Sequence, residues 1–272
     1  YRNGTSLQTL VDHLLYVKNE IKNLGNQTGY IDKESLPTLG TVSRNENGYP
    51  IGYFFGYKAI GVFQTQEEID SYISPATGKP IQPNAAPGDT KFEDLNGDGV
   101  ISDDNEDRTM IGKPNPDWMV GLTVAADWNG FDLSAFFQGS FGADVFDALR
   151  RYELAAVNYT SDALERWTGP GTSNSMPRIV LGDTPKNFRP STLLVHDASF
   201  LRLRNLQVGY TLPAQLTRKA YIQRLRFYAP FDNLLTITGY KGMDPEIGST
   251  MGIDKGVYPQ ARVYTFGLNL TF

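Results

Sequence analysis

Residues 94–107 have the residue types and the spacing of a calcium-binding loop. Asp94, Asn96 and Asp98 place side-chain oxygens at positions 1, 3 and 5, where they can converge on one hard cation. Gly99 permits the sharp turn at position 6, and a backbone carbonyl supplies position 7. The predicted calcium ligands are Asp94, Asn96, Asp98, Val100, Ser102 and Asp107.

The closing ligand of this predicted site departs from the usual spacing. Asn105 stands where a bidentate carboxylate is expected, so a loop longer by two residues would let Asp107 close the cage. The alternative is an acidic turn that keeps its shape through hydrogen bonds from Asp and Asn side chains. No helix pair is predicted on either side, so bound calcium would stabilise the loop rather than act as a sensor or in catalysis.

The other residues that could do chemistry form no recognisable catalytic set. His13 and His196 lie in no His-x-x-x-His or triad-like setting, and nucleophile-elbow, phosphate-loop and dinucleotide motifs are absent. We therefore expect no enzyme activity, although carboxylate pairs of the glycosidase type converge only in a fold. Three aromatic residues could stack on a sugar or could simply pack their own loop. These candidate substrate-binding residues are Tyr152, Tyr159 and Trp167.

Composition excludes several classes of protein. The net charge of −5 and the lack of a basic stripe argue against nucleic-acid binding. The chain has no cysteine, which fits a bacterial cell envelope. No run approaches the roughly 18 apolar residues of a membrane helix, but strands of a membrane barrel need only about 9–11 residues, half of them apolar. The chain begins at Tyr1 without a signal sequence, so we expect a mature product or a segment of a longer protein.

The clearest predicted element is a β-hairpin over 118–141. Apolar residues alternate with polar or small ones along both 118–128 and 131–141, and aromatic residues lie near the strand ends. Asn129-Gly130 between them is a strong hairpin signal, because both turn positions need a positive φ. Each strand could span one bilayer, with the aromatic residues in two interfacial belts. In a soluble sandwich the same aromatic residues would be core.

Further strands are predicted at 8–22, 50–63, 200–212, 223–237 and 258–272. The segment 8–22 could also be an amphipathic helix, but we favour a strand. The alternation of apolar and polar residues in 200–212 shifts by one residue near Asn205. This shift predicts either a β-bulge or a strand whose upper half does not contact lipid. Pro230 cannot donate to the ladder and predicts a second bulge.

The last nine residues present one apolar face and end on an aromatic residue. A strand with lipid outside and water inside needs this alternation, whereas the last strand of a soluble sandwich is the alternative. This apolar face is needed simply to meet lipid. Its residues are Tyr264, Phe266, Leu268, Leu270 and Phe272.

The predicted connections differ in length in a regular way. The links 129–130 and 213–222 are short, whereas 64–117, 142–198 and 238–257 are long and polar. Bacterial barrels combine short periplasmic turns with long extracellular loops. The pattern therefore predicts an all-β, antiparallel transmembrane barrel with every long loop outside the cell.

Over roughly 45–272 the sequence resembles the C-terminal part of the SusC/RagA family of TonB-dependent outer-membrane transporters of Bacteroidetes. The order of the matching pieces makes the resemblance specific. They are 48–58, 61–69, 94–101, 107–118, 130–139, 198–206, 209–213, 240–246 and 264–272.

This resemblance implies that 1–272 is the C-terminal part of a large plugged barrel, with plug and N-terminal strands absent. It implies import of glycans or peptides across the bacterial outer membrane, together with a SusD-like surface lipoprotein. The TonB complex would act through the missing N-terminal region. Further implied partners are the barrel-assembly machinery, the rest of the same barrel and outer-membrane lipid. The resemblance also implies that the apolar face of the last strand, 264–272, is the signal that the barrel-assembly machinery reads.

The alternative function is a secreted, calcium-stabilised β-sheet protein that binds carbohydrate. Such a protein would bury its apolar strand faces in a core and would be soluble without detergent. A barrel enzyme would need a convergent catalytic set, and the sequence shows none.

Overall fold

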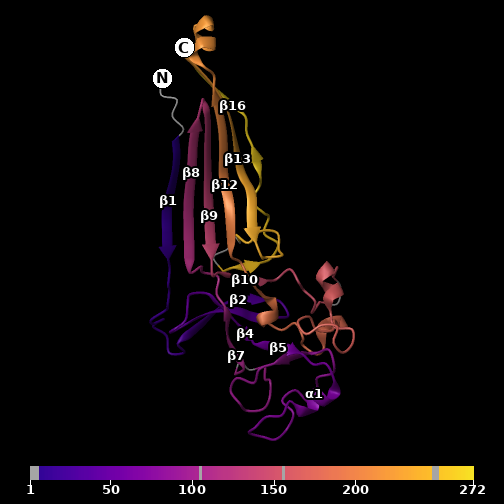
Figure 1. Cartoon of the computed structure of the whole chain (residues 1–272). Coiled ribbons are helices and arrows are strands. Elements are labelled where there is room, and N and C mark those ends of the chain that lie inside the picture. The colour runs from indigo at the N-terminus through magenta and orange to yellow at the C-terminus, as the bar shows by residue number, and fades with distance from the viewer. Residues whose placement is uncertain (1–5, 104–105, 155–156, 247–250) are drawn as a thin grey trace.

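A long antiparallel sheet occupies one half of the molecule, and the connecting segments gather in the other half (Figure 1). The computed structural model describes residues 6–103, 106–154, 157–246 and 251–272. No helix in these ranges is long and apolar enough to cross a membrane.

Within the described residues, seven strands form the long sheet, and the last two in sequence both pair with the same neighbouring strand. All pair in antiparallel fashion in the order β1 (Ser6–Tyr16), β8 (Trp118–Trp128), β9 (Phe131–Phe141), β12 (Phe200–Thr211), β13 (Arg224–Thr238), then β15 (Val263–Tyr264) and β16 (Gly267–Thr271). The β8–β9 hairpin turns at Asn129 and Gly130, with φ of 46° and 88°. The predicted hairpin is therefore confirmed.

The structure corrects three of the other strand predictions. The strand over 8–22 is confirmed in type but ends at Tyr16, and the closing strand begins at Val263 rather than at 258. The single strand over 50–63 is wrong. It is divided into β4 (Tyr53–Tyr57) and β5 (Ala59–Val62), which belong to two different small sheets.

The β-bulge near Asn205 is confirmed, but the one at Pro230 is wrong. The pairing of β12 shifts between Leu203 and Asn205 on both of its sides. Pro230 instead pairs in register with Gln207. Its missing N–H faces the other neighbour, where the ladder breaks between β15 and β16.

The connecting segments carry small sheets of their own. One has the order β2 (Tyr30–Leu36), β3 (Gly40–Glu46), β4, β7 (Arg108–Gly112), and β5 pairs with β6 (Thr90–Phe92). A third has the order β11 (Val195–Asp197), β10 (Asp144–Asp147), β14 (Ile253–Asp254). The helices are short: α1 (Gln66–Ser71), η1 (Ser161–Glu165), η2 (Leu181–Asp183), η3 (Thr192–Leu194), α2 (Ala214–Thr217) and η4 (Arg218–Ala220).

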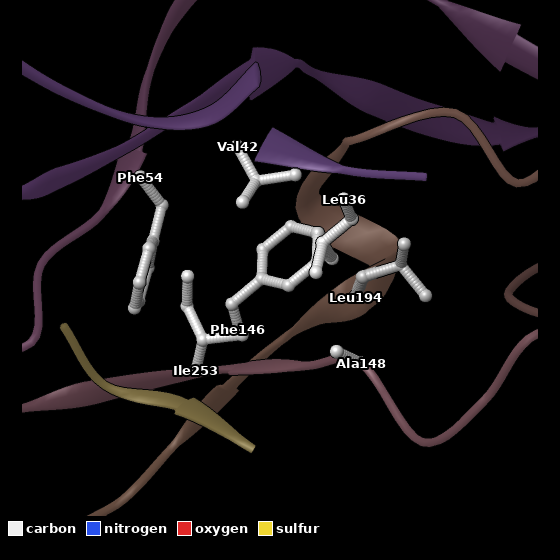
Figure 2. Packing of buried hydrophobic residues seen from close by; sticks show 7 residues of the cluster. All are labelled: Leu36, Val42, Phe54, Phe146, Ala148, Leu194 and Ile253. Carbon is white, nitrogen blue, oxygen red and sulfur yellow. The ribbon is translucent and has the colours of Figure 1, made fainter. Parts of the chain in front are cut away.

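A buried hydrophobic cluster joins these segments (Figure 2). The ring of Phe54 packs on that of Phe146 with centroids 5.9 Å apart. The buried members are Leu36, Val42, Phe54, Phe146, Ala148, Leu194 and Ile253. They come from segments more than 200 residues apart in sequence, and they include Phe54 of the predicted 50–63 strand as well as residues of the predicted loops 142–198 and 238–257. The connecting segments with their small sheets therefore share one core, and we call them the packed unit.

The two kinds of connection lie at opposite ends of the long sheet. The turn between β8 and β9 and the α2 segment lie at the upper end of Figure 1, together with the C-terminus, and the packed unit lies at the lower end. The predicted separation of short and long connections is therefore confirmed.

Candidate functional site

One face of the long sheet is apolar and uncovered. Residues paired across an antiparallel ladder share a face, so the register lines up Leu133, Val208 and Ala229 across three strands. Leu235 and Ile237 on this face are 50% and 59% exposed, as is usual for surface residues and not for a core. The part of the chain that the structure describes therefore supplies nothing to cover these residues.

Aromatic side chains mark both ends of the apolar face. Tyr16 contacts Trp118 at the end near the packed unit, with ring centroids 4.8 Å apart. At the far end Phe131 lies between Trp128 and Tyr210, at 6.4 and 4.5 Å. At about 3.4 Å per residue and a tilt of about 40°, an 11-residue strand rises roughly 26 Å, close to the apolar band of a barrel.

The opposite face of the sheet is polar and carries charge pairs. Asp132 of β9 accepts from Arg226 of β13, with 2.9 Å between its Oδ1 and the arginine Nε. Gly209 of β12 lies between the two strands, and a Cβ there would lie 2.5 Å from the Asp132 carboxylate. This ion pair therefore crosses β12 because the intervening residue has no side chain.

Two arginines of β12 hold the 238–257 connection against the polar face. Arg202 is 2% exposed, and its guanidinium binds Asp244 and Glu246, the latter at 3.0 Å. Arg204 binds Glu246 at 2.6 Å and the Gln138 amide oxygen of β9 at 2.6 Å. The pair of basic residues and the pair of acidic residues therefore form one network between sheet and loops.

A cavity of about 280 Å³ lies beside this network. Gln138 and Ser140 line it from the polar face of β9, and Glu246 and Asp144 line it from the connecting segments. Burial raises the pKa of the Asp144 carboxyl, and a hydrogen bond from the Lys113 N–H opposes that effect. A polar solute moving along this face would meet hydrogen-bonding groups on both sides of the cavity.

The acidic loop is held by hydrogen bonds from its own backbone. Asp94 accepts from the N–H of Gly97 and of Gly99 at 2.8 and 2.9 Å, and Asp98 accepts from Val100 at 2.8 Å. The buried Asp107 carboxylate accepts from the N–H groups of residues 95 and 102 at 3.1 and 3.0 Å. Asp107 therefore joins the two ends of the loop through hydrogen bonds. Its role as the closing ligand of a longer calcium loop stays a prediction, and Asn105 lies outside the described residues.

The six predicted ligands lie in this one loop, but their arrangement is that of a hydrogen-bonded turn. The Asn96 amide nitrogen donates to Asp98 and to Glu106, both at 3.0 Å. The Ser102 carbonyl accepts from the Tyr57 hydroxyl at 2.7 Å, and Val100 is exposed. Within the described ranges no three His, Cys, Asp or Glu side chains lie close enough together to hold a metal ion.

The three aromatic candidates for substrate contact pack within the connecting segments. Tyr152 is buried, with its ring 4.8 Å from that of Phe188 and 5.6 Å from that of Tyr159. Trp167 lies against Gly88 and donates from its indole nitrogen to the Gln64 amide at 3.1 Å. Of the three, the structure brings together Tyr152 and Tyr159, and it leaves Tyr159 exposed.

The five residues of the predicted assembly signal share one exposed face at the edge of the sheet. Leu268 pairs with Phe227 and Leu270 with Leu225, which extends the apolar face to the last strand. All five are at least 40% exposed: Tyr264, Phe266, Leu268, Leu270 and Phe272.

Sequence reasoning missed the packed unit and the arginine network. The signal for the unit was the run Tyr53–Tyr57, in which every residue is buried, because a continuous apolar run is typical of a strand covered on both faces. The signal for the arginine network was that its two basic residues and its two acidic residues have the same spacing in sequence. Arg202 and Arg204 are two residues apart on a strand, as are Asp244 and Glu246 in the connection.

Comparison with known proteins agrees with this two-faced sheet. TonB-dependent receptor P3 of Formosa agariphila is 34% identical over 236 residues, which cover 83% of this chain and 22% of that receptor. TonB-dependent receptor SusC of Bacteroides thetaiotaomicron is 30% identical over 257 residues, covering 93% and 23%. No protein-family model matches the chain.

Solved structures give the same result. The structure of the RagAB peptide transporter matches with a TM-score of 0.72 and 27% identity, over 100% of this chain and 28% of the other. The RagAB peptide importer in its open-open state matches with a TM-score of 0.69 and 26% identity, over 98% and 28%. This chain therefore spans about a quarter of the length of its relatives.

An antiparallel sheet with one apolar and one charged face forms the wall of a transmembrane barrel. The chain belongs to the SusC/RagA family of TonB-dependent receptors.

Proposed function

We propose that the chain forms part of the wall of an outer-membrane, TonB-dependent importer of nutrient oligomers, either peptides or glycans. The observation that carries this proposal is the single sheet with an apolar outer face, a charged inner face and all long connections at one end. Lipid would cover the apolar face, and the charged face would line the lumen. The description of RagAB as a peptide importer favours peptides as the cargo.

The connecting segments suit an encounter with an extracellular partner. They lie at the end of the sheet opposite the short turns and are folded into a packed unit rather than extended. A SusD-like lipoprotein would contact this unit from outside the cell. The TonB complex would act on a plug outside this chain, and the barrel-assembly machinery would recognise the exposed face of β16.

Calcium is proposed as a stabiliser of the acidic loop. Every carboxylate oxygen that accepts one N–H keeps a further lone pair, so the observed hydrogen bonds leave room for a cation. Holding it would require the side chains of Asp94, Asp98 and Asp107 to turn toward a common point. Calcium would then replace part of the internal hydrogen bonding without taking part in transport.

The first experiment is to find the polypeptide that carries this sequence in outer membranes solubilised with detergent. We expect an intact mass several-fold above 30.2 kDa and a plug-bearing N-terminus. Uptake of labelled peptides and oligosaccharides by cells with and without that polypeptide, and with TonB removed, would then test transport. Uptake that continues unchanged without either protein contradicts the proposal.

The secreted carbohydrate-binding alternative requires a covered apolar face. The structure leaves that face exposed, and the relatives are receptors. A 30.2 kDa species that begins at Tyr1 and stays soluble without detergent would restore the alternative.

A further inference from the structure

A second cavity, of about 450 Å³, lies within the packed unit. Its lining comes from segments far apart in sequence: the β2–β3 turn, the end of β4, β7, Asp103 of the acidic loop, and the loop residues 153 and 182–190. None of the lining residues belongs to the long sheet. The volume is in the range of sites that hold small ligands.

Two buried carboxylates, Glu153 and Asp183, line this cavity. The Glu153 side chain is 8% exposed, and its Oε1 accepts from Arg151 and from the Thr38 hydroxyl. Its Oε2 is buried and, among the described residues, has no hydrogen-bond partner. Asp183 is also buried, and its oxygens accept two backbone N–H groups at 2.9 Å. Burial chiefly, with the charge of Glu153 adding to it, raises the pKa of Asp183 to about 6.

Basic side chains line the same cavity. The Arg189 guanidinium lies 4.7 Å above the Tyr57 ring, and Arg108 lies 5.7 Å from the same ring centre. The Arg189 Nη1 is buried without a hydrogen-bond partner in the described part of the chain, and the nearest Asp103 oxygen is 3.7 Å away. Burial chiefly, with the charge of Arg189 among the lesser causes, lowers the pKa of Arg108.

The lining therefore carries both signs of charge, and it also includes Lys186 and Asp103, which pair with each other. A cation beside Glu153 and Asp183 would reduce their repulsion. An anion beside Arg108 and Arg189 would reduce the repulsion between those two groups. Glu153 offers a buried acceptor atom and Arg189 a buried donor atom, and such atoms gain most from a charged partner. A neutral sugar could form hydrogen bonds but would bring no charge to either atom.

We propose that this cavity binds a zwitterionic ligand of the amino-acid or short-peptide class, with its ammonium group at Glu153 and its carboxylate at Arg189. The idea that this cavity captures peptides for import rests on the proposed transport function. The idea that it binds a zwitterion rests on the lining residues alone.

The test is calorimetric titration of the complete receptor in detergent with three probes. These probes are dialanine, N-acetyl-dialanine and dialanine amide. Blocking either charged end should weaken binding about tenfold or more, because each block removes a charge-assisted hydrogen bond. This comparison uses the unaltered protein, so it does not depend on any variant folding.

Variants assign each end of the ligand to its residue. Glu153→Gln should weaken dialanine binding about tenfold and leave N-acetyl-dialanine unaffected, whereas Arg189→Gln should leave dialanine amide unaffected. Matched controls are Glu165→Gln and Lys219→Gln, which remove exposed charges outside the cavity and should change nothing.

Three results would overturn the proposal. The first is that dialanine does not bind at millimolar concentration, and the second is that the two blocked probes bind as tightly as dialanine. The third is that a neutral trisaccharide binds instead of the peptides and that Glu153→Gln or Arg189→Gln weakens its binding. If dialanine does not bind as expected but TonB-dependent uptake is intact, only the proposed binding site is rejected. If dialanine binds as expected but loss of the receptor affects no uptake, the proposed transport function is rejected and the binding site stands.

Discussion

Replacing Arg202 by Met should release the 238–257 connection from the barrel wall. Arg202 is 2% exposed and Asp244 is 5% exposed, so both charges are desolvated. Removing one partner of such a pair costs about 3–5 kcal/mol, because the other charge stays buried without compensation. Methionine keeps the apolar length of the side chain, so little of the loss should come from packing.

The structure favours the lower end of that range. After the change Asp244 would still accept the N–H groups of Glu246 and Gln260, both at 2.9 Å, and Glu246 would keep Arg204. We therefore expect a loss of about 3 kcal/mol, which is roughly a hundredfold in the local opening equilibrium.

Hydrogen exchange of the receptor in detergent measures this opening directly. The Glu246 and Gln260 amides, which donate to Asp244, should exchange roughly a hundredfold faster in the variant. The control is Lys255→Met, because Lys255 is paired with Glu34 at 2.9 Å but is 54% exposed. Such a pair is worth less than about 1 kcal/mol.

A double variant tests the cause. Arg202→Met combined with Asp244→Asn should lose less than the sum of the two single changes, because it removes both members of the pair. Exchange that rises less than tenfold in Arg202→Met, or strictly additive losses, would refute the reasoning.

Three further outcomes are expected. Asp98→Ala should lower the melting temperature of the receptor more with calcium than with a chelator, because it removes a calcium ligand as well as the hydrogen bonds that Asp98 accepts from Val100 and Asn96. An equal drop in both conditions would count against the site. Deleting Phe272 should reduce the amount of assembled barrel in outer membranes, and normal amounts would contradict its role as an assembly signal. Asp183→Asn should change how stability depends on pH. Because the folded pKa of Asp183 is raised from 3.8 to about 6, the native protein should lose up to roughly 3 kcal/mol relative to the variant as pH rises from 4 to 8. A pH-independent difference in unfolding free energy would show that the carboxyl titrates normally.

Alternation predicted the long strands well because two different solvents act on their two faces. Lipid and water impose a period of two, so β8, β9, β12 and β13 could be located from residue type alone. The hairpin turn was equally local, because Asn129 and Gly130 tolerate the positive φ that it needs.

The packed unit could not be predicted in the same way, because its contacts are non-local. Phe54, Phe146 and Ile253 meet in one cluster although long stretches of chain separate them. No single segment shows a period that reveals these partners, and the all-buried β4 resembles any apolar run. The cavity lined by Glu153 and Arg189 depends on the same non-local packing, so no pattern in the sequence indicates it.

The bulge in β12 explains how this strand supplies two arginines to the polar face and, further along, apolar residues to the opposite face. Up to Leu203 the apolar face takes the odd-numbered residues, and from Leu206 onward it takes the even-numbered ones. Without the extra residue, Leu206 and Val208 would point to the charged face, since a one-residue slip inverts every side chain. With it, Arg204 stays on the polar side with Arg202 and reaches Glu246. The irregular residue thus lies where the barrel wall meets the connection that it anchors, and a regular strand could not supply both the arginine pair and the apolar face beyond it.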